Sequence, residues 1–266
     1  MDNLLVEYTG PADCGGPLAR LTLNSPHNRN ALSSTLVSQL HQGLRNAAAD
    51  PAVRAVVLGH TGGTFCAGAD LSEAGGGDPF EIAVARSREM TALLRAILEL
   101  PLPVIAAVNG HVRAGGFGLV GACDIAVAGP RSTFALTEAR IGVAPVIISL
   151  TLLPKMTPRA AARYYLTGET FDAGQAAEIG LITMAAEDLD TAVAKLVAEL
   201  GRGSPQGLAA SKALTTAAVL ERFDRDAERL SQESARLFVS DEAREGMLAF
   251  LQKRPPNWAP SAGQGR

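Results

Sequence analysis

The sequence contains two short apolar runs that each lead into a glycine-rich turn. Residues 53–58 precede GGTFCAGADL at 62–71, and residues 104–108 precede NGHVRAGGFGL at 109–119. A run of four to eight apolar, β-branched residues bounded by turn residues is typical of a buried strand. The glycines leave backbone N–H groups free to face a ligand. The sequence therefore predicts two buried strands, each followed by a turn that offers backbone hydrogen-bond donors.

Strands alternate with helices in the first part of the chain. Further strands are expected at residues 18–23 and 125–128, and Ser33 is expected to cap an amphipathic helix, with another over residues 79–100. This alternation predicts an α/β fold. After about residue 157 helix starts accumulate, at residues 157–158, 172–173, 204–205 and 240–242. The C-terminal third is predicted to be mostly helical, with a short strand at residues 181–184.

Composition excludes several function classes. The 24 Lys and Arg are balanced by 27 Asp and Glu without a long block of either sign, which argues against a nucleic-acid partner. The three cysteines and four histidines share no metal-ligand spacing, so no metal is expected. The longest uncharged run, residues 141–154, is too short to span a bilayer, so no membrane partner is expected. Without an export signal, we expect a cytoplasmic protein.

Residues 116–121 form a GxGxxG pattern, which invites a dinucleotide-binding interpretation. In that motif the glycines follow the strand almost at once, whereas Gly116 lies eight residues beyond Val108. We therefore disfavour a nicotinamide cofactor. What remains is two clusters of backbone donors and an isolated acid, Glu138, which suit carbonyl chemistry. An exposed glutamate at a helix start is the alternative for Glu138.

Several segments, in the expected order, resemble the crotonase (enoyl-CoA hydratase/isomerase) superfamily. The resemblance covers nearly the whole chain. It rests on FCAGADL at residues 65–71, AAVNG at 106–110, AGG at 114–116, ACDI at 122–125, TGE at 167–169, AAEIGL at 176–181 and EGMLAFL at 245–251.

The resemblance implies a spiral of repeated ββα units followed by a C-terminal helical trimerisation region. It places an acyl-CoA site in a core over residues 1–200 and the helical region over residues 201–266. The thioester oxygen of the substrate would be held by the backbone N–H groups of Ala69 and Gly115, which form an oxyanion hole. CoA is then part of the substrate, no other cofactor is implied, and the protein would be a homotrimer or a dimer of trimers.

The same resemblance suggests which residues meet CoA. The loop after Phe65 would contact adenine and pantetheine, and a basic residue ahead of Asn30 would contact phosphates. A residue near the C-terminus would reach a neighbour's coenzyme. These expectations fall on Arg29, Ala67, Asp70, Leu71, Phe250 and Lys253.

The chain departs from the family pattern at one catalytic position. A typical hydratase carries two glutamates, and only the second is retained, at Glu138; the first is Gly118. Hydration then requires another group, such as Glu73 or Asp70, or Glu138 acting alone on a water held by backbone. A single glutamate is also the pattern of Δ3,Δ2-enoyl-CoA isomerases. A catalytically silent acyl-CoA binder is a third alternative.

Residues 115–119, 138–149 and 163–167 look like bacterial hydratases of branched enoyl-CoAs, methylglutaconyl-CoA hydratase among them. Some of those also have glycine at the position of Gly118, so hydration is the favoured reaction and isomerisation the second. The acyl pocket is expected to include Arg113, Gly118 and Val146. Arg113 is a candidate for binding a distal carboxylate, and the bulky residues 146–148 suggest a compact acyl group.

Overall fold

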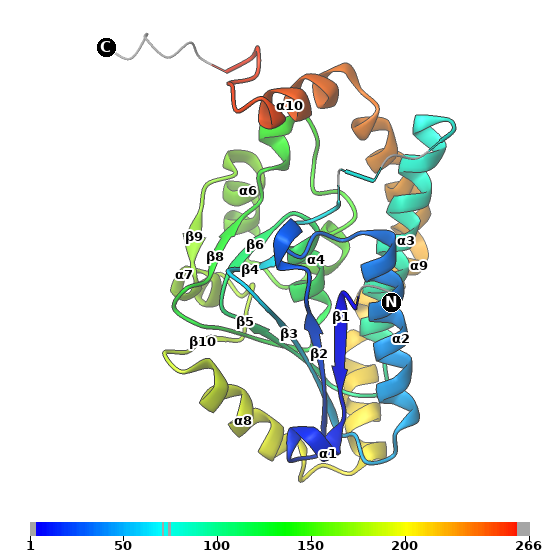
Figure 1. Ribbon diagram of the computed structural model, residues 1–266, viewed down its shortest axis with the longest axis vertical. Coiled ribbons are helices and arrows are strands. Elements are labelled where there is room, and N and C mark those ends of the chain that lie inside the picture. The colour runs from blue at the N-terminus through cyan, green and yellow to red at the C-terminus, as the bar shows by residue number, and fades with distance from the viewer. Residues whose placement is uncertain (1–3, 71, 74–75, 260–266) are drawn as a thin grey trace.

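A computed structural model of the protein describes residues 4–70, 72–73 and 76–259, which form two β-sheets flanked by helices (Figure 1). The larger sheet has the strand order β1-β2-β3-β5-β7-β10, and only β1 is antiparallel to its neighbour. Its strands are β1 (Val6–Thr9), β2 (Leu18–Leu23), β3 (Ala55–His60), β5 (Val104–Val108), β7 (Ile125–Ala128) and β10 (Met184–Ala185).

The smaller sheet has the order β4-β6-β8-β9, with β4, β6 and β8 parallel and β9 antiparallel. Its strands are β4 (Thr64–Cys66), β6 (His111–Arg113), β8 (Thr133–Ala135) and β9 (Phe171–Asp172). The helices are α1 (Pro11–Cys14), α2 (Ser34–Ala49), α3 (Pro79–Glu99), α4 (Gly115–Ala122), α5 (Ser149–Leu152), α6 (Pro158–Thr167), α7 (Ala173–Glu178), α8 (Leu189–Leu200), α9 (Pro205–Phe238) and α10 (Asp241–Leu251), with 3₁₀ turns η1 (Pro26–Asn28) and η2 (Glu138–Ile141).

The chain repeats one structural unit three times. The pairs β3–β4, β5–β6 and β7–β8 each give one strand to the larger sheet and one to the smaller. They lead into α3, α4 and η2, respectively. This arrangement is the spiral of ββα units that the resemblance implies, and it confirms the expected α/β class.

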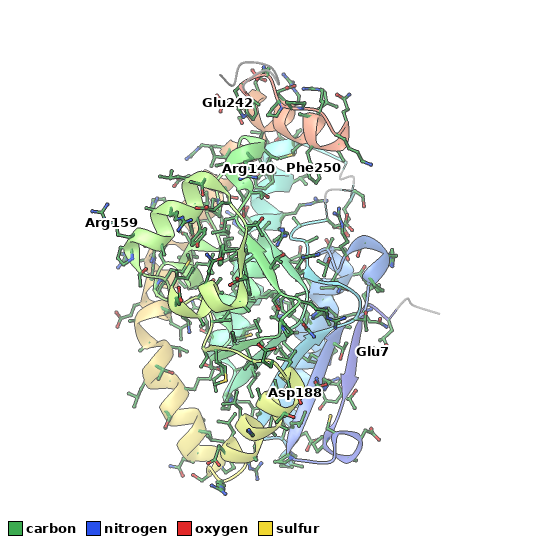
Figure 2. The ribbon with its side chains drawn as sticks, turned by 90° about the vertical axis from the view of Figure 1, so that its left-hand side faces the viewer. Glu7, Arg140, Arg159, Asp188, Glu242 and Phe250 are labelled. Carbon is green, nitrogen blue, oxygen red and sulfur yellow. The ribbon has the colours of Figure 1, made fainter. Side chains whose placement is uncertain are left out.

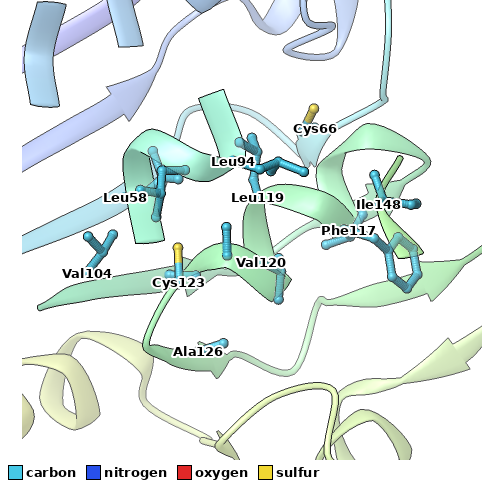
Figure 3. Close-up of a cluster of buried hydrophobic side chains, with 14 of the residues drawn as sticks. Leu58, Cys66, Leu94, Val104, Phe117, Leu119, Val120, Cys123, Ala126 and Ile148 are labelled. Carbon is cyan, nitrogen blue, oxygen red and sulfur yellow. The ribbon is translucent and has the colours of Figure 1, made fainter. Parts of the chain in front are cut away.

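Both faces of the larger sheet are buried, which explains why its strands are almost continuously apolar. Val56, Leu58 and Ala106 belong to the main core with α2, α3 and α4, whereas Val57 and Ile105 pack towards α8. Figure 1 shows α2, α3 and α9 on one side of this sheet and α8 on the other. Helix α4 lies inside the core, with every residue from Gly116 to Ala122 buried (Figure 3).

The C-terminal helices pack on the core of the same chain. Helix α9 runs along α3, and its buried Lys212 donates to the carbonyl oxygens of Ile97 and Leu102 and pairs with Asp124 at 2.8 Å. Helix α9 begins close to the expected boundary at residue 201, and the division into two regions stays a prediction. Among the described residues, no helix combines the length and the apolar character needed to cross a bilayer.

Most expected elements are confirmed. The strand expected at residues 53–58 begins two residues later, at Ala55, and of the one expected at 181–184 only Met184 lies in a strand, β10. Ser33 caps α2 by accepting from the Leu36 N–H, and Asp172, Ser204 and Ser240 cap later helices in the same way.

Candidate active site

Three parallel strands of the smaller sheet bring three site segments to one edge. β6 pairs with both β4 and β8, with Cys66 opposite Val112 and Arg113 opposite Ala135. The carboxyl ends of neighbouring parallel strands lie at the same edge of a sheet. Ala69 follows β4 by three residues, Gly115 follows β6 by two, and Glu138 follows β8 by three. The three residues that the sequence singled out for chemistry therefore share this edge.

The first two turns touch each other, and glycine makes that contact possible. Gly68 has a φ of +95°, and a Cβ atom built on it would lie 2.6 Å from Ala114 Cβ and 3.2 Å from Gly115 N. A Cβ atom on Gly116 would lie 2.7 Å from Cys66 O. Any side chain at these positions would push the turns apart. The backbone of the Ala69 turn is thus packed against the start of α4.

The N–H groups of Ala69 and Gly115 are available to a ligand. Neither donates a hydrogen bond to another described residue, and Ala69 is exposed while Gly115 is half-buried. Gly115 opens α4, and Ala114 before it has φ 43° and ψ −121°, a conformation that costs an alanine roughly 1–3 kcal/mol. This conformation at Ala114 joins β6 directly to the start of α4.

Backbone bonds to Leu32 hold the Ala69 turn. The Leu32 N–H donates to Gly68 O at 2.7 Å, and the Asp70 N–H donates to Leu32 O at 3.2 Å. These bonds use the groups on either side of Ala69 and leave its own N–H unused. The turn is therefore fixed before any ligand arrives, which is what an oxyanion site requires.

Glu138 is buried without a hydrogen-bond partner for one of its oxygens. The residue begins η2 and is 7% exposed, and its Oε2 contacts no donor among the described residues. Burial raises the pKa of the Glu138 carboxyl to about 7, against a small opposing effect of its own backbone. A carboxyl with this pKa exchanges protons readily near neutral pH. The alternative of an exposed helix-start glutamate is wrong.

Helix α10 holds η2 in place. Gly142 ends η2 with φ +78°, and a Cβ atom there would lie 2.5 Å from the Glu242 carbonyl carbon. A Cβ atom on Gly246 would clash with the backbone of Ile141. Figure 2 shows Arg140 on η2 below α10, which carries Glu242. The turn that carries Glu138 is therefore clamped between the sheet and the C-terminal helix.

Apolar side chains enclose the position of the missing glutamate. A Cβ atom on Gly118 would lie 2.6 Å from Ile148 Cγ2, 2.9 Å from Met90 Cε and 3.3 Å from Leu94 Cδ1. Leu94 and Ile148 belong to the buried cluster around α4 in Figure 3. No carboxylate fits at Gly118 unless these side chains move.

The two acids considered as substitutes have other partners. Glu73 accepts from the N–H and hydroxyl of Ser34, and Asp70 accepts from the N–H and hydroxyl of Ser72. These bonds lower the pKa of the Asp70 carboxyl. Of the three acids, only Glu138 has an oxygen that is both buried and unpaired.

Three of the expected CoA contacts lie together. Ala67 N donates to Arg29 O at 3.1 Å, and Asn28 Nδ2 donates to the Asp70 carboxylate at 3.3 Å. The Arg29 side chain is exposed beside this loop. Leu71 lies outside the described residues. The CoA-binding roles of these residues stay predictions.

Phe250 and Lys253 belong to a different part of the molecule. Phe250 is 57% exposed on α10, and Lys253 follows that helix with a φ of 54° (Figure 2). Within the described part of the chain, the Lys253 side chain makes no hydrogen bond to the loop around Asp70. Their expected contact with a neighbour's coenzyme stays a prediction.

The two remaining candidates for the acyl pocket, Val146 and Arg113, differ in how their side chains are held. Val146 is 9% exposed and starts the apolar segment that ends at Ile148. Arg113 is half-buried, and its guanidinium donates to the carbonyl oxygens of Val112 and Thr133 and to the Thr133 hydroxyl. These bonds tie β6 to β8, and a role of Arg113 in binding a distal carboxylate stays a prediction.

The sequence alone did not point to two groups near the site. Met90 on α3 covers both Gly115 and Gly118, and Tyr165 on α6 has a buried hydroxyl without a partner among the described residues. Met90 was visible only as one member of an apolar helix stripe. Tyr165 lies in one of the segments that carried the resemblance, but spacing cannot show that its hydroxyl is buried.

Neither a metal cluster nor the polar cavity beside β3 and β5 coincides with this edge. Within residues 4–70, 72–73 and 76–259, no group of three or more His, Cys, Asp and Glu side chains could hold an ion. A polar cavity of about 460 Å³ lies between β3, β5 and the start of α8. Ala69, Gly115 and Glu138 do not line it.

Known proteins share this sequence and fold. Enoyl-CoA hydratase EchA19 of Mycobacterium tuberculosis is 34% identical over 251 residues, which cover 90% of this chain and 91% of that protein. Mevalonyl-coenzyme A hydratase sidH of Aspergillus fumigatus is 34% identical over 254 residues, or 91% of each chain. A crystal structure of an enoyl-CoA hydratase from Mycobacterium avium matches with a TM-score of 0.92 at 78% identity, covering 97% of this chain and 100% of that chain.

The model of one protein family matches almost the whole sequence. The match runs over residues 14–261 and carries the description enoyl-CoA hydratase/isomerase. It includes all three segments that meet at the edge of the smaller sheet. Together with the relatives, it shows that the chain belongs to the enoyl-CoA hydratase/isomerase family.

Proposed function

We propose that the protein adds water across the double bond of a 2-enoyl-CoA thioester. The observation that carries this proposal is that two free backbone N–H groups, at Ala69 and Gly115, and the buried carboxyl of Glu138 follow three parallel strands at the same sheet edge. Such a site stabilises an enolate oxygen and moves a proton beside it. The related proteins named above as hydratases support the same reaction.

In this mechanism one carboxyl group serves twice. The Glu138 carboxylate takes a proton from water as the water oxygen bonds to C3. The electrons of the C2=C3 bond move onto the thioester oxygen, where the N–H groups of Ala69 and Gly115 stabilise the negative charge. Glu138 then returns its proton to C2, the thioester carbonyl re-forms, and the carboxylate is restored. No second carboxylate is consumed or required.

The acyl group is proposed to be compact and branched. Val146, Ile147 and Ile148 are buried beside α4, and Ile148 fills the space next to Gly118. Large side chains in an acyl pocket disfavour long straight chains. The relative from Aspergillus fumigatus is named for mevalonyl-coenzyme A, which is an acyl-CoA with a branch point.

Isomerisation of a 3-enoyl-CoA is the second candidate. The apolar surroundings of Gly118 favour it, because they remove the first glutamate of the two-carboxylate pattern. Glu138 would then carry one proton from C4 to C2, with the same N–H groups stabilising the dienolate between the two steps.

The assembly is proposed to be a homotrimer or a dimer of trimers in the cytoplasm. Helix α10 exposes Leu248, Phe250 and Leu251, which are 44%, 57% and 69% exposed. Three large apolar side chains on one short helix favour contact with another protein surface. A neighbouring copy would cover this face and bring Lys253 towards its coenzyme.

Mass spectrometry after incubation with matched 2-enoyl- and 3-enoyl-CoA substrates tests the proposal. Hydration adds the mass of one water to the product, whereas isomerisation leaves the mass unchanged. The panel should include straight, branched and carboxylated acyl groups. Hydration of a branched 2-enoyl-CoA is the expected result. Conversion of 3-enoyl-CoAs alone would replace the proposal with isomerisation, and binding without turnover would indicate a silent binder.

A further inference from the structure

Tyr165 carries a hydroxyl group that the mechanism above does not use. Its Oη is buried and lacks a hydrogen-bond partner, and among the described side chains it shares this state only with Glu138 Oε2. Leaving a buried polar atom unpaired costs free energy, so such atoms are rare and call for an explanation. The ring of Tyr165 packs against the main core, which fixes where the hydroxyl lies.

Tyr165 and Glu138 belong to two elements that are held together. Arg140 on η2 donates from Nε and Nη2 to the Thr167 carbonyl oxygen at the end of α6, at 3.1 and 2.9 Å. A Cβ atom on Gly168 would lie 3.0 Å from Leu136 O, just before Glu138. The end of α6 therefore contacts the chain on both sides of Glu138.

Burial and nearby charges both act on the Tyr165 phenol. Burial, and after it the charge of Glu138, raises the pKa of the Tyr165 phenol well above its ordinary value, while Arg222 on α9 acts in the opposite direction. The phenol is therefore neutral at physiological pH and cannot serve as a base. A neutral phenol oxygen still accepts one hydrogen bond and donates another.

A water that attacks C3 needs an oriented lone pair. One carboxylate fixes only one of its two O–H bonds, and a second acceptor fixes the other. The second acceptor cannot come from Gly118, because Ile148, Met90 and Leu94 enclose that position. Tyr165 is the other buried and unpaired polar side chain in the described part of the chain.

We propose that the Tyr165 hydroxyl holds the added water together with Glu138 Oε2. One O–H of the water donates to Glu138 and the other to Tyr165 Oη, so that the oxygen lone pair faces C3. Tyr165 thereby fills the orienting role of the missing carboxylate without becoming charged. This inference rests on the proposed hydration reaction.

Tyr165→Phe tests the inference, with Tyr164→Phe as a matched control. Both variants remove one hydroxyl from neighbouring positions of α6, but the Tyr164 ring packs on Phe171 with centroids 4.0 Å apart, and its oxygen is not a buried unpaired atom. With a 2-enoyl-CoA that the wild type hydrates, Tyr165→Phe should lower kcat by roughly tenfold to hundredfold and leave KM nearly unchanged. Tyr164→Phe should retain kcat.

The pH profile supplies a readout that a purely structural role would not change. Loss of the hydroxyl and of the water it holds leaves Glu138 in drier surroundings. The acidic limb of kcat/KM should therefore move to higher pH in Tyr165→Phe and stay in place in Tyr164→Phe. Melting temperatures of both variants, measured beside wild type, verify that they fold.

The outcomes separate this inference from the proposed function. If wild type hydrates and Tyr165→Phe hydrates equally well, the inference is wrong and the hydratase stands. If wild type only isomerises, both are wrong. A loss limited to acyl groups with a distal polar group, seen in KM, would assign the hydroxyl to substrate binding and overturn the water-holding role.

Discussion

The two halves of the candidate site differ in the groups they use: one offers backbone N–H donors and the other a buried carboxyl. The Ala69 and Gly115 half is built from backbone, and it depends on glycines that let two turns touch and on strain at Ala114. The Glu138 half is one side chain kept dry by its surroundings. Charge on an oxygen is stabilised by donors fixed in advance, whereas proton transfer needs a group whose pKa is near the working pH. Substitutions that affect one half should therefore spare the functions of the other.

Glu138→Gln should have the largest effect. Gln cannot take up the proton of water, so kcat should fall by about 10²–10⁴-fold. Affinity for a saturated acyl-CoA should change little, because the N–H groups of Ala69 and Gly115 are untouched. Steady-state kinetics and calorimetric binding measure the two quantities. Glu178→Gln, an exposed acid on α7, is the control and should match wild type. Unchanged turnover in Glu138→Gln would remove Glu138 from the mechanism.

Gly68→Ala should have the next largest effect on kcat, and it acts on the half of the site built from the backbone of Ala69 and Gly115. The new Cβ would lie 2.6 Å from Ala114 Cβ at a φ of +95°, so the two turns must separate. Loss of one oxyanion donor costs about 10²–10³-fold in kcat, and acyl-CoA affinity should weaken as well.

Gly63→Ala is the control for Gly68→Ala. It lies on the same glycine-rich segment, and a Cβ atom there has no neighbour within 4 Å. This variant should keep wild-type kinetics. If Gly68→Ala also kept them, the close contact of the turns would not be needed to hold the thioester oxygen.

The sequence predicted the glycine-rich turns of the site better than the surroundings of Glu138. Strand, glycine turn and helix start are local signals, and they predicted the turns after β4 and β6. The resemblance named Ala69 and Gly115 within those turns, and their role stays a prediction. The resemblance supplied the ββα spiral, which the structure confirms, although the three units share no obvious sequence repeat. Their likeness lies in strand placement between two sheets, which many sequences satisfy.

The surroundings of Glu138 depend on contacts between segments distant in sequence. Ile148 fills the space at Gly118, α10 clamps η2 through Gly142 and Gly246, and the end of α6 approaches from another direction. Periodicity reports which residues are buried but not which buried residues meet. The raised pKa of Glu138 results from these long-range contacts, so it could not be predicted from the position of Glu138 in the sequence.

The pH dependence of activity should be a smaller effect than either substitution and should separate the halves without a mutation. Burial raises the pKa of Glu138 to about 7, and in the proposed mechanism its carboxylate is the base that accepts the water proton. Activity should therefore fall about tenfold per pH unit below 7. Backbone amides do not titrate, so affinity for a saturated acyl-CoA should stay constant over about one pH unit on either side of the Glu138 pKa. A parallel fall in affinity would mean that the two halves are coupled.

Stability should change with pH in the opposite sense to activity. Glu138 binds its proton more tightly in the folded protein than at its ordinary pKa of 4.5, so its contribution to stability is present below pH 4.5 and lost as pH rises through about 7. The difference corresponds to about 3 kcal/mol. Glu138→Gln should therefore melt several degrees above wild type at pH 8 and close to it at pH 5, as thermal unfolding followed by circular dichroism would show. Equal melting temperatures at pH 8 would mean that the Glu138 carboxylate is better solvated than its burial indicates. That result would contradict the claim that the surroundings keep this carboxyl dry.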